Sequence, residues 1–419
     1  MRRVLGIPVF RRLAGAAIVN ELALIAGEIA LALLVYHRTG SAIGATAFFL
    51  CAQVGPAFVS PLVVTRLDQI AARPALVLIY ALQALIFVLL GELLASLAIP
   101  VVLLAALIQG SLAVSARVLS RAAWTSITQA GGLLRDASAV VNFAASMCFF
   151  VGPALGGGLV ALGGTRLALL VNAGLFALCI GAVGTTKDLP RPIPDRTSVL
   201  RRVRSAIVYA RREPIVRRLL SLQAVFMIFF TISIPVELVF ARETLHAGAA
   251  GYGLLLSAWG GGATLGSVVY ARWRRTSSRV LVSLGATFVG LGLLPMAVAP
   301  DLAVAVLGAC IAGIGNGIEI VAVRTVLQET APAKSMAMIL SLNESLLLAM
   351  PGIGIIAGGA ITALAGPRLA LGVGAAGALA VGVAMWTILP SSRAEGAMRL
   401  RPADAELEER GVTVAARRP

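Results

Sequence analysis

Residues 161–171 read A-L-G-G-T-R-L-A-L-L-V, and residues 363–373 read A-L-A-G-P-R-L-A-L-G-V. Eight of the eleven positions match, at an offset of 202 residues. In each copy a short glycine-containing turn lies between two long apolar runs. A weaker match pairs residues 34–38 with residues 238–242 at an offset of 204. This pattern predicts two halves that repeat the same order of elements in the same orientation.

The composition of the whole chain is typical of a membrane protein. Its 419 residues are 59% hydrophobic and only 13% charged, whereas a soluble domain carries about 25% charged residues. A water-soluble fold cannot hide such an excess of apolar side chains, because its surface needs polar cover. At about 20 residues for each membrane-spanning helix, the apolar residues are enough for about twelve spans. A soluble enzyme, a secreted disulfide scaffold and a disordered protein are therefore excluded.

We expect an all-α integral membrane protein with twelve spans in two parallel six-helix halves, residues 1–185 and 219–390. Between the halves, residues 186–218 are predicted to form a cytoplasmic basic linker with an interfacial helix. Residues 391–419 are predicted to form a cytoplasmic tail. The predicted spans are 13–35, 42–63, 75–97, 101–120, 137–162, 166–185, 219–240, 251–270, 280–299, 302–323, 337–363 and 368–389.

The distribution of basic residues predicts the orientation of these spans. Connections on the side of the N-terminus hold 29 Lys and Arg residues, and those on the other side hold four. The positive-inside rule then places both termini in the cytoplasm. We expect a multi-pass monomer in the lipid bilayer of the cell (inner) membrane. The net charge of +16 comes from these short clusters rather than from a basic face, so no nucleic-acid partner is expected.

Several motifs resemble those of the major facilitator superfamily. Residues 66–73 (R-L-D-Q-I-A-A-R) resemble its loop G-x-x-x-D-R-x-G-R-R between the second and third spans, with Asp68 and Arg73 at matching positions. Residues 152–157 (G-P-A-L-G-G) resemble the core of its exporter-associated motif in the fifth span. Residues 109–110 (Q-G) resemble the end of its R-x-x-Q-G motif, whose arginine this chain lacks. The resemblance covers about residues 10–390.

The order of the motifs is most similar to the enterobactin-exporter-like branch, which exports drugs or siderophores. The resemblance implies a secondary transporter, more often an exporter, that is driven by the proton gradient and has the major facilitator fold. The further motifs that carry it are residues 27–28 (G-E), 35–41 (V-Y-H-R-T-G-S), 252–255 (Y-G-L-L), 260–262 (G-G-G) and 324–328 (R-T-V-L-Q).

Five charged residues fall on predicted spans 1, 4, 7 and 10, which line the central cavity in this superfamily. A charged side chain inside the bilayer is costly unless it is paired or hydrated, so each is a candidate functional residue. A carboxylate kept from bulk water can take up and release a proton near neutrality, which proton coupling needs. A structural hydrogen bond to a neighbouring helix is the alternative role. The predicted proton-coupling and substrate cavity contains Glu21, Glu28, Arg117, Glu237 and Glu319.

Within this set, Glu21 and Glu28 lie seven residues apart, which places both on one face of the first span. We expect Arg117 of the fourth span to supply positive charge to Glu28 in one state of the transport cycle.

Two further groups of candidates lie outside the predicted cavity. The first is a cytoplasmic gate or interface at the inner ends of the spans, made of Asp68, Arg73, Arg121, Arg324 and Glu344. The second lies in the fifth span, where glycines permit close helix packing and a proline permits a kink or hinge. It consists of Gly152, Pro153, Gly156 and Gly157.

We expect no enzyme activity, cofactor or metal site, because the cysteines lie scattered in apolar runs and both histidines lie in outer loops. The favoured function is a proton-coupled antiporter that exports small amphipathic molecules, such as a drug or a siderophore-like metabolite. An uptake carrier or facilitator for a nutrient or lipid is the alternative. A membrane sensor without transport is the third hypothesis.

Overall fold

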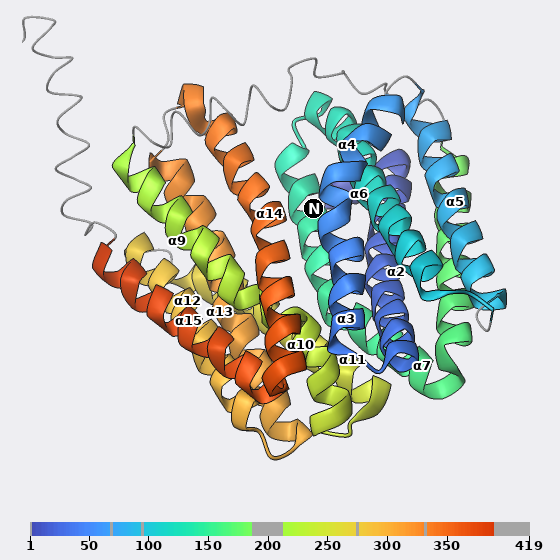
Figure 1. Ribbon diagram of the computed structural model, residues 1–419. Coiled ribbons are helices and arrows are strands. Elements are labelled where there is room, and N and C mark those ends of the chain that lie inside the picture. The colour runs from blue at the N-terminus through green and yellow to red at the C-terminus, as the bar shows by residue number, and fades with distance from the viewer. Residues whose placement is uncertain are drawn as a thin grey trace, which may run out of the picture.

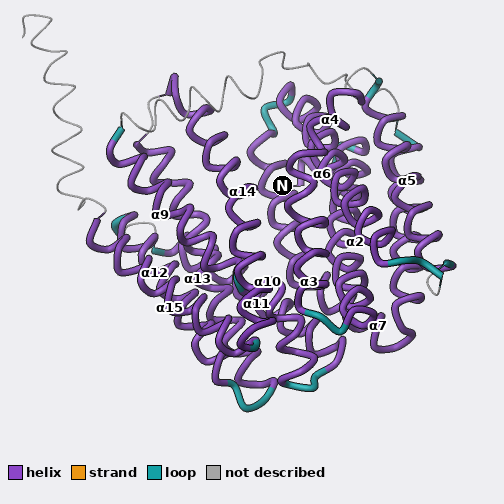
Figure 2. The backbone as a smooth tube through the Cα atoms, in the orientation of Figure 1, coloured by secondary structure: helices purple, strands orange, loops and turns teal. Residues whose placement is uncertain are grey.

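The computed structural model describes residues 2–67, 70–93, 96–186, 213–273, 276–330 and 333–388. Over these ranges the chain is helical and has no strand, with short loops confined to the two ends of the helices (Figure 2). In this described part, eleven helices are long and apolar enough to cross a membrane. The sequence predicts twelve spans, and the difference lies in one long element, α7 (Leu134–Gly184).

α7 is 51 residues long, about 75 Å if it were straight, which exceeds a bilayer of about 30 Å. The helix is broken at Gly163 and Gly164, whose backbone angles are not helical. Gly164 has φ +71°, a conformation that glycine adopts without the steric cost of a Cβ atom. Figure 1 shows that the chain reverses direction within α7.

Both arms of α7 pack against the same part of α2 (Pro8–Thr39). In the first arm, a Cβ atom built at Gly156 would lie 2.7 Å from the carbonyl oxygen of Ala26. In the second arm, the side chain of Asn172 lies 2.5 Å from a Cβ atom built at Gly27. Residues on opposite sides of the break therefore reach the same level of α2. α7 is an antiparallel pair of spans, and the described helices make the twelve crossings that were predicted.

The remaining elements follow the predicted spans closely. Two spans contain a π-helical turn, η1 in the second span and η2 in the seventh. The first half contains α1 (Arg2–Leu5), α2, α3 (Ala42–Phe49), η1 (Leu50–Val54), α4 (Gly55–Leu67), α5 (Ala72–Glu92), α6 (Ile99–Ala130) and α7. The second half contains α9 (Pro214–Thr231), α10 (Ser233–Val239), η2 (Phe240–Thr244), α11 (Gly248–Arg272), α12 (Ser278–Val298), α13 (Leu302–Thr330), α14 (Ala333–Ala365) and α15 (Pro367–Ile388).

The two halves lie side by side, and their helices converge at one end and diverge at the other (Figure 1). We call the end with the turns at Gly40, Gly164, Asp301 and Gly366 the closed end. The opposite end, where the described chain stops at residue 186 and resumes at residue 213, is the linker end. The predicted interfacial helix of the linker and the predicted tail lie outside the described residues.

The halves are in close contact where α7 meets α11. A Cβ atom at Gly253 would lie 2.5 Å from the carbonyl oxygen of Pro153, and one at Gly260 would lie 2.1 Å from that of Phe149. Distances this short leave no space for a side chain, so the two backbones touch directly. Small residues permit such close approach between membrane helices. We call this contact between α7 and α11 the seam. It extends toward the closed end and lies beside the cavity described next.

Candidate functional site

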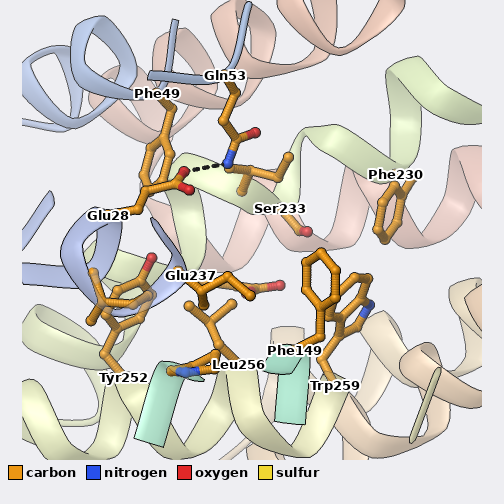
Figure 3. A pocket seen from close by; sticks show the side chains of 14 residues that line it. Glu28, Phe49, Gln53, Phe149, Phe230, Ser233, Glu237, Tyr252, Leu256 and Trp259 are labelled. Carbon is orange, nitrogen blue, oxygen red and sulfur yellow. Dashed lines mark hydrogen bonds between the residues drawn. The ribbon is translucent and has the colours of Figure 1, made fainter. Parts of the chain in front are cut away.

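A cavity of about 350 Å³ lies between the two halves. This volume is in the range of small-molecule binding sites. Its walls come from α2, α3, η1 and α7 of the first half and from α9, α10 and α11 of the second (Figure 3). The lining residues are Ile25, Glu28, Ile29, Phe49, Gln53, Phe149, Pro153, Phe230, Ser233, Ile234, Glu237, Tyr252, Leu256 and Trp259.

Glu28 of α2 accepts a hydrogen bond from Nε2 of Gln53 at 2.6 Å. Gln53 belongs to the π-helical turn η1, and single π-helical turns inside α-helices occur frequently at functional sites. The neutral amide satisfies one carboxylate oxygen without supplying a positive charge. Glu28 is therefore held in place by the first half but keeps its capacity to bind a cation or a proton.

Glu237 of α10 enters the same cavity from the second half (Figure 3). The residue is only 7% exposed, and its carboxylate has a hydrogen bond from the side chain of Ser233, one helical turn earlier. Tyr252 of α11 is buried nearby and lies within electrostatic range of both Glu28 and Glu237. The two carboxylates thus face one cavity from opposite halves of the molecule.

Aromatic rings also line the cavity. The ring of Trp259 stacks on Phe230 at a centroid distance of 6.1 Å and meets Phe149 edge-on at 6.4 Å. Nε1 of Trp259 is buried and has no hydrogen-bond partner among the described residues. The cavity is therefore amphipathic, because two carboxylates and several aromatic rings line the same space (Figure 3).

Glu21 and Arg117 do not line this cavity. Nε and Nη2 of Arg117 donate to the two carboxylate oxygens of Glu21 at 3.1 and 2.8 Å, which makes a bidentate pair within the first half. The pair borders a separate hollow of about 110 Å³, which Arg121 also lines. In this conformation Arg117 does not supply charge to Glu28, because its partner is the carboxylate of Glu21, two turns away on α2. That it does so in another state of the cycle stays a prediction.

Glu319 also lies elsewhere. Its side chain is completely buried inside the second half, where its Cβ atom would lie 2.7 Å from a Cβ atom built at Gly285 of α12. Gln223 of α9 is its polar neighbour. The sequence places all five charged residues in one cavity, whereas the structure brings only Glu28 and Glu237 together. The other three residues do not line it. Glu21 and Arg117 border the separate hollow two turns away along α2, and Glu319 is buried within the second half. Hydropathy reports neither the depth of a residue along a helix axis nor the rotation of the helix.

The predicted gate residues make their contacts within one half. Arg324 pairs with Glu344 inside the second half. Arg73 donates from Nη2 to the carbonyl oxygen of Gly184 inside the first half. Asp68 lies outside the described residues. The two halves are apart at the linker end, so these contacts join helices of the same half. A gate across the halves stays a prediction.

The glycines of the fifth span lie at helix crossings. A Cβ atom at Gly152 would lie 2.8 Å from the side chain of Ile25, and Gly156 meets α2 as described above. A Cβ atom at Gly157 would lie 2.6 Å from the carbonyl oxygen of Ala249 in the other half. Pro153, which lies between Gly152 and Gly156 in the sequence, lines the cavity. The motif therefore joins α7 to α2 on one side and to α11 on the other.

Sequence reasoning missed most of the cavity wall. Gln53 is detectable in the sequence, because it is a polar residue inside an apolar span. Tyr252 is part of the Y-G-L-L motif, which does not by itself indicate a cavity. Phe149, Phe230 and Trp259 carried no signal, because an aromatic residue in an apolar span is as consistent with lipid contact as with a cavity.

Comparison with known protein families agrees with this architecture. The family model described as "Transmembrane secretion effector", a model of the major facilitator superfamily, matches residues 4–412. The chain belongs to this family. It is a membrane transporter rather than an enzyme, and the predicted superfamily is confirmed. No curated protein matches the sequence.

Solved transporter structures share the fold at low sequence identity. A point mutant of the nucleoside transporter NupG has a TM-score of 0.71 at 14% identity, over 91% of this chain and 100% of that chain. A D-xylose–proton symporter has a TM-score of 0.68 at 15% identity, over 92% and 98%. A bacterial homologue of the human lysosomal transporter Spinster, inward-facing and unoccupied, has 0.65 at 15%, over 91% and 95%. At such identities the likeness shows the fold alone.

Proposed function

We propose that the chain is a proton-coupled antiporter that exports small amphipathic molecules by alternating access. The observation that carries this proposal is the cavity between the halves, which is lined by Glu28 and Glu237 and by aromatic rings. Parallel repeats place a substrate site at such an interface. The resemblance of the motifs to the enterobactin-exporter-like branch supports export.

The shape of the described helices supports loading from the cytoplasm. The halves touch at the closed end and diverge toward the linker end (Figure 1). The excess of basic residues at the linker end favours a cytoplasmic location for that end under the positive-inside rule. In this orientation the protein lies in the cell membrane with both termini inside, and its cavity faces the compartment from which an exporter takes its substrate.

The two cavity carboxylates supply a route to proton coupling. A carboxylate facing a water-poor cavity is costly to ionise, and two that face the same cavity repel each other when both are charged. Protons entering from the outer side neutralise them, and release on the inner side restores the charge. Because Glu28 and Glu237 belong to different halves, their charge state affects how the halves approach each other.

An uptake carrier would have the same fold, so direction needs a transport experiment. Purified protein is reconstituted in liposomes, and a pH gradient is imposed without a sodium gradient. The probes are three amphipathic dyes, namely cationic ethidium, neutral Nile red and anionic 8-anilinonaphthalene-1-sulfonate. We expect at least one dye to move against its gradient, in exchange for protons.

The control is liposomes that carry the Glu28→Gln Glu237→Gln double variant, whose insertion is checked by the amount reconstituted. Movement of every dye with equal speed in wild-type and variant liposomes would refute coupling through the cavity. Co-transport of dye and protons in the same direction would instead favour the uptake carrier.

A further inference from the structure

We propose that the cavity selects amphipathic cations, with a protonated amine or quaternary ammonium group held between Glu28 and Glu237. The apolar part of the substrate then lies against Phe149, Phe230 and Trp259. This inference rests on the proposed function, because it takes the cavity as the transport site, and it narrows the substrate to one charge class.

The first support is the absence of basic residues from the cavity wall. Of the fourteen described residues that line it, two are glutamates and none is Lys, Arg or His. Arg117, which the sequence predicts in this cavity, is instead paired with Glu21. A negative charge inside the bilayer is costly unless a partner compensates it. A substrate cation supplies that partner, and a substrate anion adds a third negative charge.

The second support is the hydrogen bonding of the carboxylates. Gln53 and Ser233 each donate to a carboxylate as neutral groups. Such bonds orient an acid but leave its net charge in place. Glu28 and Glu237 therefore present a preformed site for a cation, whose binding replaces no existing ion pair in the described structure.

The third support is the cluster of aromatic rings in the same cavity wall. Trp259 is held by stacking on Phe230 and by edge contact with Phe149. The face of an indole ring attracts a cation through its quadrupole, more strongly when water is excluded. The same rings cover the apolar part of a substrate. Carboxylates and aromatic rings that line one cavity match a molecule with one positive group and a hydrophobic body.

The siderophore-like metabolites considered from the sequence do not fit this site when they are anionic. Their charge would meet Glu28 and Glu237 without a described basic residue in the cavity wall. Among the substrates expected from the sequence, the cavity favours cationic, drug-like molecules.

The test compares two probes of nearly the same shape and opposite charge, tetraphenylphosphonium and tetraphenylborate. Their binding to purified full-length protein in a nonionic detergent is measured by equilibrium dialysis without any gradient. We expect saturable tetraphenylphosphonium binding and an affinity for tetraphenylborate at least about tenfold weaker, about 1.4 kcal/mol. The Glu28→Gln Glu237→Gln variant should lose this preference.

The matched control is Glu92→Gln, which removes an acid of a half-exposed ion pair with Arg166 at the closed end. It should bind both probes as the wild type does. Size-exclusion profiles and melting temperatures show whether each variant folds. Where the double variant fails to fold, Trp259→Leu replaces it and should weaken binding of the cation but not reverse the order of the two probes.

Equal affinity for both probes, or no saturable binding of tetraphenylphosphonium, overturns the proposal. Retention of the full preference in a folded double variant also overturns it. These results are independent of the transport experiment, because binding is measured without a gradient. A protein that moves only the anionic or neutral dye would keep the proposed function and refute the cation preference.

Discussion

The hydroxyl group of Tyr36 donates a hydrogen bond to Oε1 of Glu243 and so joins the first half to the second at the closed end. Tyr36 lies in the last turn of α2, and Glu243 lies in the π-helical turn η2. These residues are 207 positions apart in the sequence. Their contact can form only while the closed end is shut, so it contributes to the stability of the described conformation over one open at that end.

Tyr36→Phe should therefore shift the protein toward opening at the closed end. Loss of one hydrogen bond of about 1 kcal/mol would change the ratio of the two conformations about fivefold. Distances between spin labels on the two halves at the closed end measure this shift. The control is Glu92→Gln, because its partner Arg166 belongs to the same half. A longer distance in both variants, or in neither, would show that the hydrogen bond does not stabilise the closed end.

The seam between the halves gives a second prediction from adjacent glycines. A Cβ atom at Gly157 would lie 2.6 Å from the carbonyl oxygen of Ala249, whereas one at Gly158 would meet nothing within 4 Å. Gly157→Ala should therefore slow transport about tenfold, about 1.4 kcal/mol in barrier, and Gly158→Ala should leave it near the wild-type rate. Efflux of a transported dye, normalised to the amount of protein in the membrane, measures both. Equal rates for the two variants would show that close approach at the seam is not needed.

The ion pair of the first half predicts an asymmetry between its partners. The Glu21 side chain is 10% exposed, and the Arg117 side chain is 50% exposed. Arg117→Met leaves a buried carboxylate without its partner, at a cost of about 1–3 kcal/mol. Glu21→Gln leaves a cation that water still reaches, so it should lower the melting temperature less.

Addition of Glu21→Gln to Arg117→Met should then raise the melting temperature above that of Arg117→Met alone. Thermal unfolding of the four proteins in detergent completes this cycle. An additive loss in the double variant would show that the two side chains contribute to stability independently.

Orientation can be tested with two introduced thiols. Asp301 and Thr276 are exposed and lie at the closed end and the linker end, respectively. The positive-inside rule predicts that the closed end faces outward. A membrane-impermeant maleimide added to intact cells should modify Asp301→Cys and leave Thr276→Cys unmodified until the membrane is permeabilised. The reverse pattern would invert the topology and, with it, the proposed direction of loading.

The spans could be predicted from the sequence because burial in a bilayer requires long apolar runs, which hydropathy detects directly. The turn at Gly163 and Gly164 was also predictable, since it separates two such runs beside Arg166. In the structure only Gly163 and Gly164 separate the two helical arms of α7.

The site was less predictable. Glu28 and Glu237 stand out as charges in apolar spans, and both reach the cavity. Glu319 carries the same signal and is buried inside the second half. The difference arises from the rotation of each helix about its axis, which depends on packing between distant segments. Arg117 pairs with Glu21 instead of Glu28. Because both glutamates share one face of α2, their depth along the helix decides this pairing, and hydropathy does not report that depth.

The most direct test of the central claim, that one cavity exchanges protons for a substrate cation, is proton release on binding. Tetraphenylphosphonium is added to purified protein in weakly buffered detergent solution near neutral pH, and a pH indicator records the protons released. Wild-type protein should release about one proton for each cation bound, because the carboxylate pair exchanges one for the other. The Glu28→Gln Glu237→Gln variant should release none. Tight binding of the cation by the wild type without proton release would contradict the mechanism.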